Sequence, residues 1–412
     1  SLNCFRAMQS LGNQRRNGSA VCSWLVAGFV VCCSLLLLRF SSTASCRRER
    51  AFNHLLTPNE LLRSFPLPFT LKRFVNESRA EAAAILSATD DRLIVVVGPC
   101  SIHDPEAARD YARRLHEVKE ELQSDLFIIM RTYLEKPRTS VGWKGLVTDP
   151  DLSGADDLAR GLALGRRVLL DMNALGLPTA VEFLDPLVAP YIEDAVTYGS
   201  IGARTVESPT HRALAASLQM PMGFKNTRTG DIESAVNAAV AAAAPQKRLA
   251  PDGRGRVRIV QADGNPQPHI ILRGGESGPN FGEEFVAEAR ELLTKAGFSG
   301  AQIMIDCSHG NSRKKYENEV IACRSVAEQV AGGNTAIGGV LIESFLVAGN
   351  QKLDPGVTDV KKLVYGRSVT DSCMDFNSTK DLLQELAAAV VTRRGQVSQS
   401  WKEATKPVPL NA

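Results

Sequence analysis

Short apolar runs alternate with longer segments of helical periodicity from about residue 91 onward. Eight apolar runs are strand candidates: Leu93–Val97, Leu126–Met130, Thr179–Phe183, Ile201–Ala203, Met222–Phe224, His269–Leu272, Gln302–Ile305 and Gly338–Ile342. Between them, apolar residues recur every three or four positions, as in Ala107–Leu122, Leu158–Leu175, Glu283–Ala296 and Lys315–Val330. This alternation predicts parallel βα units, and eight such units are the number that closes a barrel.

Each predicted strand ends close to a polar or reactive side chain. In chain order these are Cys100, Arg131, Glu182, Arg204, Lys225, Arg273, Asp306 with His309, and Glu343. In an open, doubly wound sheet these ends would spread over roughly 35 Å at a strand spacing of ~4.8 Å. In a closed barrel they meet on one face. We therefore predict an α/β fold of the (β/α)8 TIM-barrel class, with its site on that face.

The other segments divide the chain further. We predict a targeting leader or membrane-anchor segment, otherwise disordered, over 1–46, an N-terminal extension over 47–90, the barrel over 91–396 and a flexible tail over 397–412. The extension contains a predicted helix over Glu77–Leu86, and a long loop over Val357–Asn377 precedes a terminal helix over Leu382–Arg394. Residues 246–267 are too long and too rich in Gly and Pro for an ordinary connection. They predict a hairpin inserted between the fifth helix and the sixth strand.

Basic residues are concentrated at the start of the chain. The first fifty residues hold seven arginines and one acidic residue, Glu49, while the whole chain has a formal net charge of +3. The remainder is slightly acidic, which argues against nucleic acid as a partner. Ala20–Leu38 carries no charge and is followed by a segment rich in Ser and Arg, typical of a transit peptide. We expect a cleaved bipartite leader to a plastid, with a cytoplasmic location or a membrane anchor as alternatives.

The cysteines follow the same division. Five of nine lie in the first 46 residues, and the body keeps Cys100, Cys307, Cys323 and Cys373. Such sparse cysteines are no disulfide framework and suit a reducing compartment.

The role of Cys100 is not decided by its position, directly after the pair Gly98-Pro99 at the end of the first predicted strand. It can be a nucleophile, a metal ligand or packing. Together with His309, Glu343 and Asp371 it forms a set that can hold one divalent transition metal ion, Mn, Fe, Co or Zn. We expect His103 to lie near a helix cap opened by Asp104-Pro105 and not to be a ligand.

Cationic side chains form the second candidate constellation. Four of these residues stand at the ends of predicted strands: Arg131, Arg204, Lys225 and Arg273. The loop that follows Arg131 adds Lys136, Arg138 and Lys144. So many cations repel one another unless anions fill the space, and Arg binds phosphate and carboxylate through two-point contacts. The pattern predicts substrates with several phosphate or carboxylate groups. The alternative is that each cation pairs with a nearby acid such as Glu182 or Glu135.

Eight motifs carry a family resemblance. They read GPCSIHD, RTYLEKPRTSVGWKG, SIGARTVESPTHR, GFKN, HIILRGG, IMIDCSHGNSRK, VLIESF with GNQ, and YGRSVTD. From about Leu55 to Arg394 the chain resembles the type I 3-deoxy-D-arabino-heptulosonate 7-phosphate synthases. The resemblance implies a transferase that condenses phosphoenolpyruvate with D-erythrose 4-phosphate and releases phosphate. That reaction opens the shikimate pathway to chorismate and the aromatic amino acids.

The resemblance also implies roles for residues. It places the metal on Cys100, His309, Glu343 and Asp371. It assigns phosphoenolpyruvate to Arg131, Lys136, Arg204, Lys225 and Arg273, and erythrose 4-phosphate to Lys136, Arg138 and Thr139. Lys136 and Arg131 are the catalytic candidates, and we expect the surrounding cations to lower the pKa of Lys136. The metal is expected to act as a Lewis acid on the aldehyde oxygen.

The resemblance further implies a homodimer or homotetramer and a feedback site for an aromatic amino acid at the hairpin. There the chain departs from the family over Lys247–Gly253, and Gln219 stands where relatives have a small residue. We expect the catalytic site to be kept, and inhibition by Phe, Tyr or Trp is an open question.

Three other functions are alternatives. The first is condensation with arabinose 5-phosphate, against which the KPRT and GWKGLVTDP segments argue. The second is a non-catalytic barrel that regulates another shikimate enzyme, against which the retained metal-type and cationic residues argue. The third is a membrane-anchored protein, which depends on Ala20–Leu38.

Overall fold

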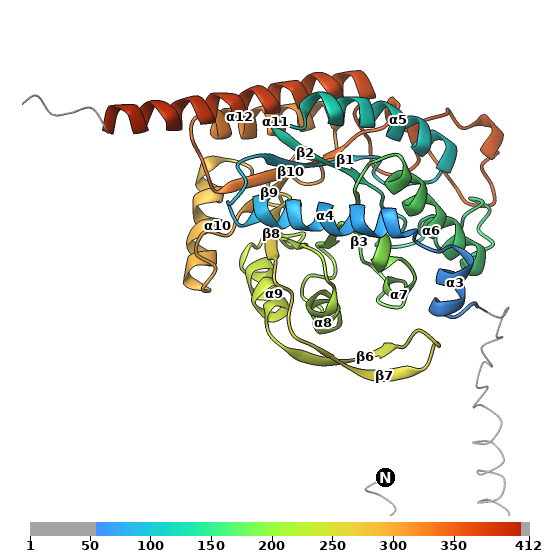
Figure 1. The fold of residues 1–412 in the computed structure, drawn as a ribbon. Coiled ribbons are helices and arrows are strands. Elements are labelled where there is room, and N and C mark those ends of the chain that lie inside the picture. Colours follow the sequence, from blue (N-terminus) through green and yellow to red (C-terminus); the bar gives the residue numbers. More distant parts are fainter. Residues whose placement is uncertain (1–54, 405–412) are drawn as a thin grey trace, which may run out of the picture. The chain divides into compact units, whose positions relative to one another are not determined.

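Eight parallel strands form a closed barrel in the order β1-β10-β9-β8-β5-β4-β3-β2 (Figure 1). The structure is a computed structural model and describes residues 55–404, with side chains to residue 396. The barrel strands are β1 Leu93–Gly98, β2 Leu126–Arg131, β3 Thr179–Glu182, β4 Tyr198–Ile201, β5 Met222–Lys225, β8 Pro268–Leu272, β9 Ile303–Asp306 and β10 Ile337–Glu343. The predicted (β/α)8 fold class is confirmed.

Helices cover the outside of the barrel (Figure 1). They are α5 Pro105–Leu122, α6 Leu158–Ala174, α7 Ala189–Ile192 with the 3-10 helix η1 Glu193–Ala195, α8 Pro209–Ser217, α9 Glu233–Ala243, α10 Glu283–Lys295, α11 Tyr316–Ala331 and α12 Phe376–Ala404. Helix α5 begins as predicted, with Pro105 in its first turn and Asp104 as the cap. The Asp104 carboxylate accepts hydrogen bonds from the backbone N–H of Glu106 and Ala107, which satisfies donors that have no partner within the helix.

The strands are buried on both faces, because the barrel interior lies on one side and helices on the other. All six residues of β1 are buried, and Val96 pairs with Ile129 of β2 and Leu341 of β10. The N-terminal extension forms α3 Pro58–Ser64 and α4 Phe69–Leu86. Ile85 and other buried residues of α4 pack against interior barrel side chains. Helix α4 therefore closes the amino-terminal end of the barrel and leaves the other end for the site.

The predicted hairpin is present between α9 and the sixth barrel strand. Strands β6 Gln246–Pro251 and β7 Val257–Ala262 pair in antiparallel register, with Leu249 opposite Ile259. These two side chains are 70% and 74% exposed. The hairpin thus presents an apolar outer face.

Some boundaries differ from prediction. The fourth strand ends at Ile201, where its predicted range began, so Arg204 lies in the following loop. The strand starts with small and polar residues that no apolar run signals. A Cβ atom at Gly199 would lie 2.3 Å from the Met222 sulfur and 2.9 Å from a ring carbon of Phe183, so a larger residue there would displace both side chains.

The chain after the last barrel strand is more ordered than expected. The long loop contains the 3-10 helix η2 Val360–Lys362 and β12 Arg367–Ser368, which pairs with β11 Val347–Asn350. Helix α12 is longer than the predicted Leu382–Arg394 and continues into the segment that we expected to be a flexible tail. The leader segment 1–46, with Ala20–Leu38, lies outside the described residues. Within the described part of the chain, no helix is long and apolar enough to cross a membrane.

Candidate active site

A cavity of about 530 Å³ opens at the carboxyl ends of the barrel strands. All residues that we predicted for the two substrates line it, together with His309 and Asp371. Its walls carry nine basic side chains and three acidic ones, Glu182, Glu276 and Asp371. The basic ones are Arg131, Lys136, Arg138, Arg204, Lys225, Arg228, Arg273, Arg313 and Lys314. This excess of positive charge favours anions with several negative charges.

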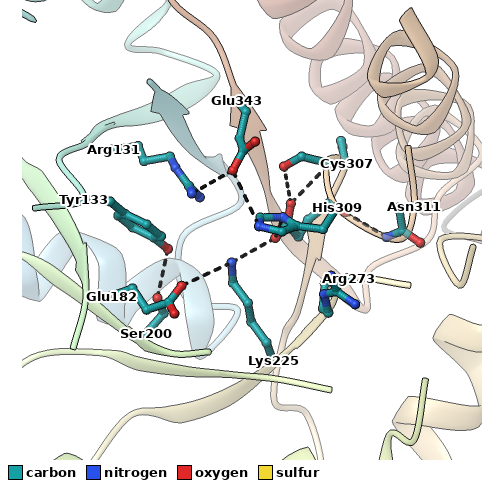
Figure 2. Close-up of polar contacts among 12 residues, drawn as sticks. Arg131, Tyr133, Glu182, Ser200, Lys225, Arg273, Cys307, His309, Asn311 and Glu343 are labelled. Atoms are coloured by element: carbon teal, nitrogen blue, oxygen red, sulfur yellow. Dashed lines mark hydrogen bonds and ion pairs between the residues drawn. The ribbon is translucent and has the colours of Figure 1, made fainter. Parts of the chain in front are cut away.

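The deepest cations are paired with carboxylates (Figure 2). Arg131 Nη2 lies 2.8 Å from Glu343 Oε1, and both side chains are 1% exposed. Lys225 Nζ lies 3.0 Å from Asp306 Oδ2 and 3.9 Å from Glu182 Oε2. For Arg131 and Lys225 the alternative is therefore correct that the cations pair with acidic residues. Their main partners are Glu343 and Asp306, and of the two acids that we named only Glu182 takes part. These pairs fix Arg131 and Lys225 in place before any ligand binds.

Glu135, one of the acids expected to pair, has a different environment. Its carboxyl group accepts hydrogen bonds from the backbone N–H of Leu184 and Asp185. Burial raises the pKa of Glu135 to about 8. It does not neutralise the cationic wall.

Three of the cations nearer the mouth lack carboxylate partners, whereas Arg228 pairs with Glu276 and Lys314 lies 4.0 Å from Asp371. Among residues 55–396, no carboxylate oxygen lies within ion-pair distance of Arg138, Arg204 or Arg273. Arg204 Nη2 donates to Thr139 Oγ1 at 3.3 Å, and burial lowers the pKa of Arg273. Unpaired guanidinium groups in a concave site are suited to phosphate and carboxylate oxygens.

Three predicted metal ligands cluster beside this wall. One ligand atom each from Cys100, Glu343 and Asp371 lie within 4.8 Å of one another. The fourth, His309, lies at the edge of the cluster: its Nε2 is 3.5 Å from Glu343 Oε1, and its Nδ1 is 2.9 Å from Asp306 Oδ2. A thiol, two carboxylates and an imidazole are a donor set that fits a divalent transition metal ion.

A positive charge already sits at this cluster. Lys136 Nζ lies 2.8 Å from Cys100 Sγ and 3.0 Å from Asp371 Oδ2. An ammonium group among these donors shows that the site stabilises a cation, which supports the fit of a metal ion.

The same contacts change the acidity of the groups. Burial, together with the charges of Glu343 and Asp371, raises the pKa of the Cys100 thiol to about 11. Burial acts to lower the pKa of Lys136, but Cys100, Asp371 and Glu343 outweigh it and the pKa is raised. Our expectation of a lowered Lys136 pKa is wrong for this arrangement, because its nearest neighbours are the acidic groups of Cys100, Asp371 and Glu343 and not other cations.

Several site residues were not predicted. Tyr133 places its ring 3.6 Å from the Arg131 guanidinium carbon, and its hydroxyl lies 2.9 Å from Ser200 Oγ (Figure 2). Glu319 of α11 accepts a 3.0 Å hydrogen bond from the backbone N–H of Glu343. Tyr133 stands two residues after a strand end, so a wider reading of strand ends would have found it. Glu319 comes from a helix and has no such signal.

Comparison with known proteins identifies the family. The profile described as DAHP synthetase I family matches residues 73–384. The chain belongs to this family. The Phe-sensitive phospho-2-dehydro-3-deoxyheptonate aldolase of Escherichia coli (strain K12) is 47% identical over 84% of the chain and 98% of its own length. The Trp-sensitive one of Enterobacter agglomerans is 45% identical over 84% and 98%.

A solved structure agrees. The phospho-2-dehydro-3-deoxyheptonate aldolase from Francisella tularensis SCHU S4 superposes with a TM-score of 0.81 at 45% identity, over 84% of this chain and 99% of that one. These matches confirm the resemblance from the motifs. This member of the DAHP synthetase I family is an enzyme, a transferase of the 3-deoxy-7-phosphoheptulonate synthase class in the shikimate pathway.

Proposed function

We propose that this DAHP synthetase I family member condenses phosphoenolpyruvate with D-erythrose 4-phosphate in a metal-dependent reaction. One observation carries the proposal. A single cavity contains cations without carboxylate partners and reaches the cluster of metal-type donors through Asp371, with His309 beside it. Both features are needed when two anionic substrates must meet beside a Lewis acid.

The phosphoenolpyruvate site is proposed to consist of two layers. Arg131 and Lys225 form the inner layer, where Glu343 and Asp306 hold them in position. Arg204 and Arg273 form the outer layer and have no carboxylate partner among the described residues. Lys136 lies between this wall and the metal-type cluster. A wall fixed in advance stabilises developing negative charge without rearrangement.

Erythrose 4-phosphate is proposed to bind toward the mouth, at Lys136, Arg138 and Thr139. Arg138 and Thr139 are exposed and line the cavity. Arg138 Nε donates to the carbonyl of Trp143 at 2.7 Å, which orients the side chain and leaves its remaining N–H groups for a phosphate.

The proposed metal ligands are Cys100, His309, Glu343 and Asp371. A bound divalent transition metal ion, Mn, Fe, Co or Zn, would act as a Lewis acid toward the aldehyde oxygen. The four side chains would hold the ion, and Asp306, 2.9 Å from His309 Nδ1, would orient the imidazole so that Nε2 faces Glu343.

In the proposed reaction the methylene carbon of phosphoenolpyruvate forms a bond to the aldehyde carbon. Water adds to the enol carbon, and inorganic phosphate leaves with cleavage of its carbon–oxygen bond. Arg131 stabilises the negative charge of phosphoenolpyruvate from its buried position. Lys136 carries its proton at Nζ beside Cys100 and Asp371, where it can donate to the oxygen of the former aldehyde.

The test is an assay of the purified protein with phosphoenolpyruvate and either aldose, before and after complete metal removal. We expect turnover with erythrose 4-phosphate that stops on chelation and returns with Mn²⁺ or Zn²⁺. Turnover that survives chelation would contradict the proposed metal dependence. Faster turnover with arabinose 5-phosphate than with erythrose 4-phosphate would show that the proposed substrate is wrong.

We also propose feedback inhibition by an aromatic amino acid at the hairpin β6–β7. Relatives named Phe-sensitive and Trp-sensitive support it. Titration of the activity with Phe, Tyr and Trp tests it, and a protein that responds to none of the three contradicts it. A control variant that shortens the turn 252–256 should keep turnover.

We further propose a homodimer or homotetramer. The exposed apolar face of the hairpin, formed by Leu249, Val257 and Ile259, supports a contact with a second copy. Light scattering of the purified protein tests it, and a monomeric mass at micromolar concentration contradicts it. The four thiols of the described chain are free, which supports a reducing compartment, plastid or cytoplasm.

A further inference from the structure

A second cavity, of about 460 Å³, lies at the opposite end of the barrel from the active site. Its lining residues come from the starts of β1, β9 and β10, from the end of α4 and from helix α12. None of its lining residues belongs to the site described above. Its size falls within the range of small-molecule sites, roughly 300–1,000 Å³.

Arg393 of α12 is the unusual residue in this cavity. Its side chain lines the cavity and is only 7% exposed. Nη2 donates to the main-chain carbonyl of Asp91, and the other guanidinium nitrogens have no hydrogen-bond partner among residues 55–396. No carboxylate of the described chain forms an ion pair with it. The carboxylate of Asp91 acts on it only from beyond ion-pair distance. A buried guanidinium without a direct anionic partner is costly, so the arrangement favours an anionic ligand.

The neighbouring charges are already paired. Arg92 Nη2 lies 2.7 Å from Asp90 Oδ2, and Arg394 Nη2 lies 2.6 Å from Asp91 Oδ1. The cavity lining therefore carries three arginines and two aspartates. Arg92 also pairs with Glu81, and Arg394 with Asp125. Arg393 is thus the one arginine of this lining without a carboxylate within ion-pair distance among the described residues, which matches a ligand with a single carboxylate.

The floor of the cavity is apolar, with one amide. Ile85 is 2% exposed and Ile337 is 1% exposed. Gln302 is 7% exposed, and its side-chain amide has no hydrogen-bond partner in the described part of the chain. A guanidinium with hydrogen-bond donors to spare, an amide whose side chain has no partner and an apolar floor are the pattern of a small-molecule site with few, directed polar contacts.

We propose that this cavity binds a small organic monocarboxylate with an apolar body. The carboxylate accepts hydrogen bonds from Arg393 and from the Gln302 amide, and the apolar body packs on Ile85 and Ile337. A phosphate group would leave the apolar floor unused and bring more charge than the single unpaired arginine balances. The site is separate from the catalytic cavity and does not depend on the function proposed above.

Calorimetric titration of the full chain tests this with 3-phenylpropionate and its neutral analogue 3-phenylpropanamide. We expect the acid to bind roughly ten- to hundredfold more tightly than the amide, because the amide loses a charge-assisted hydrogen bond. Arg393→Gln should remove that difference. Arg273→Gln, at the active site, is the matched control and should leave it unchanged.

Three outcomes overturn the proposal: no binding of the acid to the wild-type chain, equal binding of acid and amide, or full binding by Arg393→Gln. Loss of binding in Arg273→Gln also overturns it, because the acid then occupies the active site. Near-ultraviolet circular dichroism shows whether each variant is folded. If Arg393→Gln is not folded, Gln302→Leu takes its place and is expected to weaken binding of the acid.

Discussion

The buried guanidinium of Arg131 donates a 2.8 Å hydrogen bond to the carboxylate of Glu343 (Figure 2). Arg131 ends β2 and Glu343 ends β10, and both flank β1, which leads to Cys100. The pair therefore links the anion-binding wall to the metal-type cluster. The carboxylate of Glu343 belongs both to the ion pair with Arg131 and to the metal-type cluster. The anion-binding wall and the cluster therefore meet at the ends of β2, β1 and β10.

The first prediction concerns the energy of this pair. Arg131→Met or Glu343→Gln alone should lower the free energy of unfolding by about 3–5 kcal/mol, because each leaves a buried charge without its partner. The double variant should be more stable than the sum of the two losses predicts. Urea unfolding of the four proteins in chelator measures the coupling, and strictly additive losses would show that the pair does not interact.

The second prediction concerns the thiol. Cys100→Ala should abolish metal-dependent turnover and the charge-transfer absorption that Co²⁺ shows when a thiolate binds it. Cys323→Ala is the matched control, since Cys323 is equally buried but lies on α11 outside the cluster. It should keep both signals. A Co²⁺–thiolate band that persists in Cys100→Ala excludes Cys100 as a ligand.

The third prediction concerns the outer cations. Arg273→Gln should raise KM for phosphoenolpyruvate roughly ten- to hundredfold, because a charged hydrogen-bond donor contributes about 1.5–3 kcal/mol. Metal affinity should stay unchanged, since Arg273 is no part of the metal-type cluster. Arg290→Gln, on the exposed side of α10, is the control and should leave KM unchanged. An unchanged KM in Arg273→Gln removes this residue from the substrate site.

Much of the fold and part of the site follow from local patterns. Arg131, Lys225 and Glu343 were predicted together because a parallel barrel brings all strand ends to one face. The order of strands and helices is enough to place these residues at the carboxyl end of the barrel. Strand order alone does not predict which of the residues at that end contact one another.

Contacts between residues of different loops could not be predicted from the order of strands and helices. Lys136 reaches Cys100 and Asp371 across 36 and 235 positions of sequence, and the path of two loops decides this. The same holds for Arg393, whose place on the terminal helix was predicted. Its burial depends on how α12 packs beside the starts of distant strands.

The last prediction concerns acid stability. Burial lowers the pKa of His103 and of His269 to about 4, from the usual 6.5. His269 Nε2 also lies 2.6 Å from the hydroxyl of Tyr198 inside the barrel. Both rings are neutral in the folded chain above pH 4, whereas in the unfolded chain they take up protons below pH 6.5. Between pH 6.5 and pH 4 the unfolded state therefore binds more protons than the folded state. The free energy of unfolding decreases as the pH is lowered through this window.

Each histidine contributes on the order of 3 kcal/mol to that fall, since one pKa unit corresponds to about 1.4 kcal/mol. Urea unfolding at several pH values between 7 and 4 measures the slope. His269→Asn removes one of the two groups and should give a shallower slope, even if its stability at pH 7 is lower. Equal slopes for the variant and the wild-type chain would show that His269 is not kept neutral by burial.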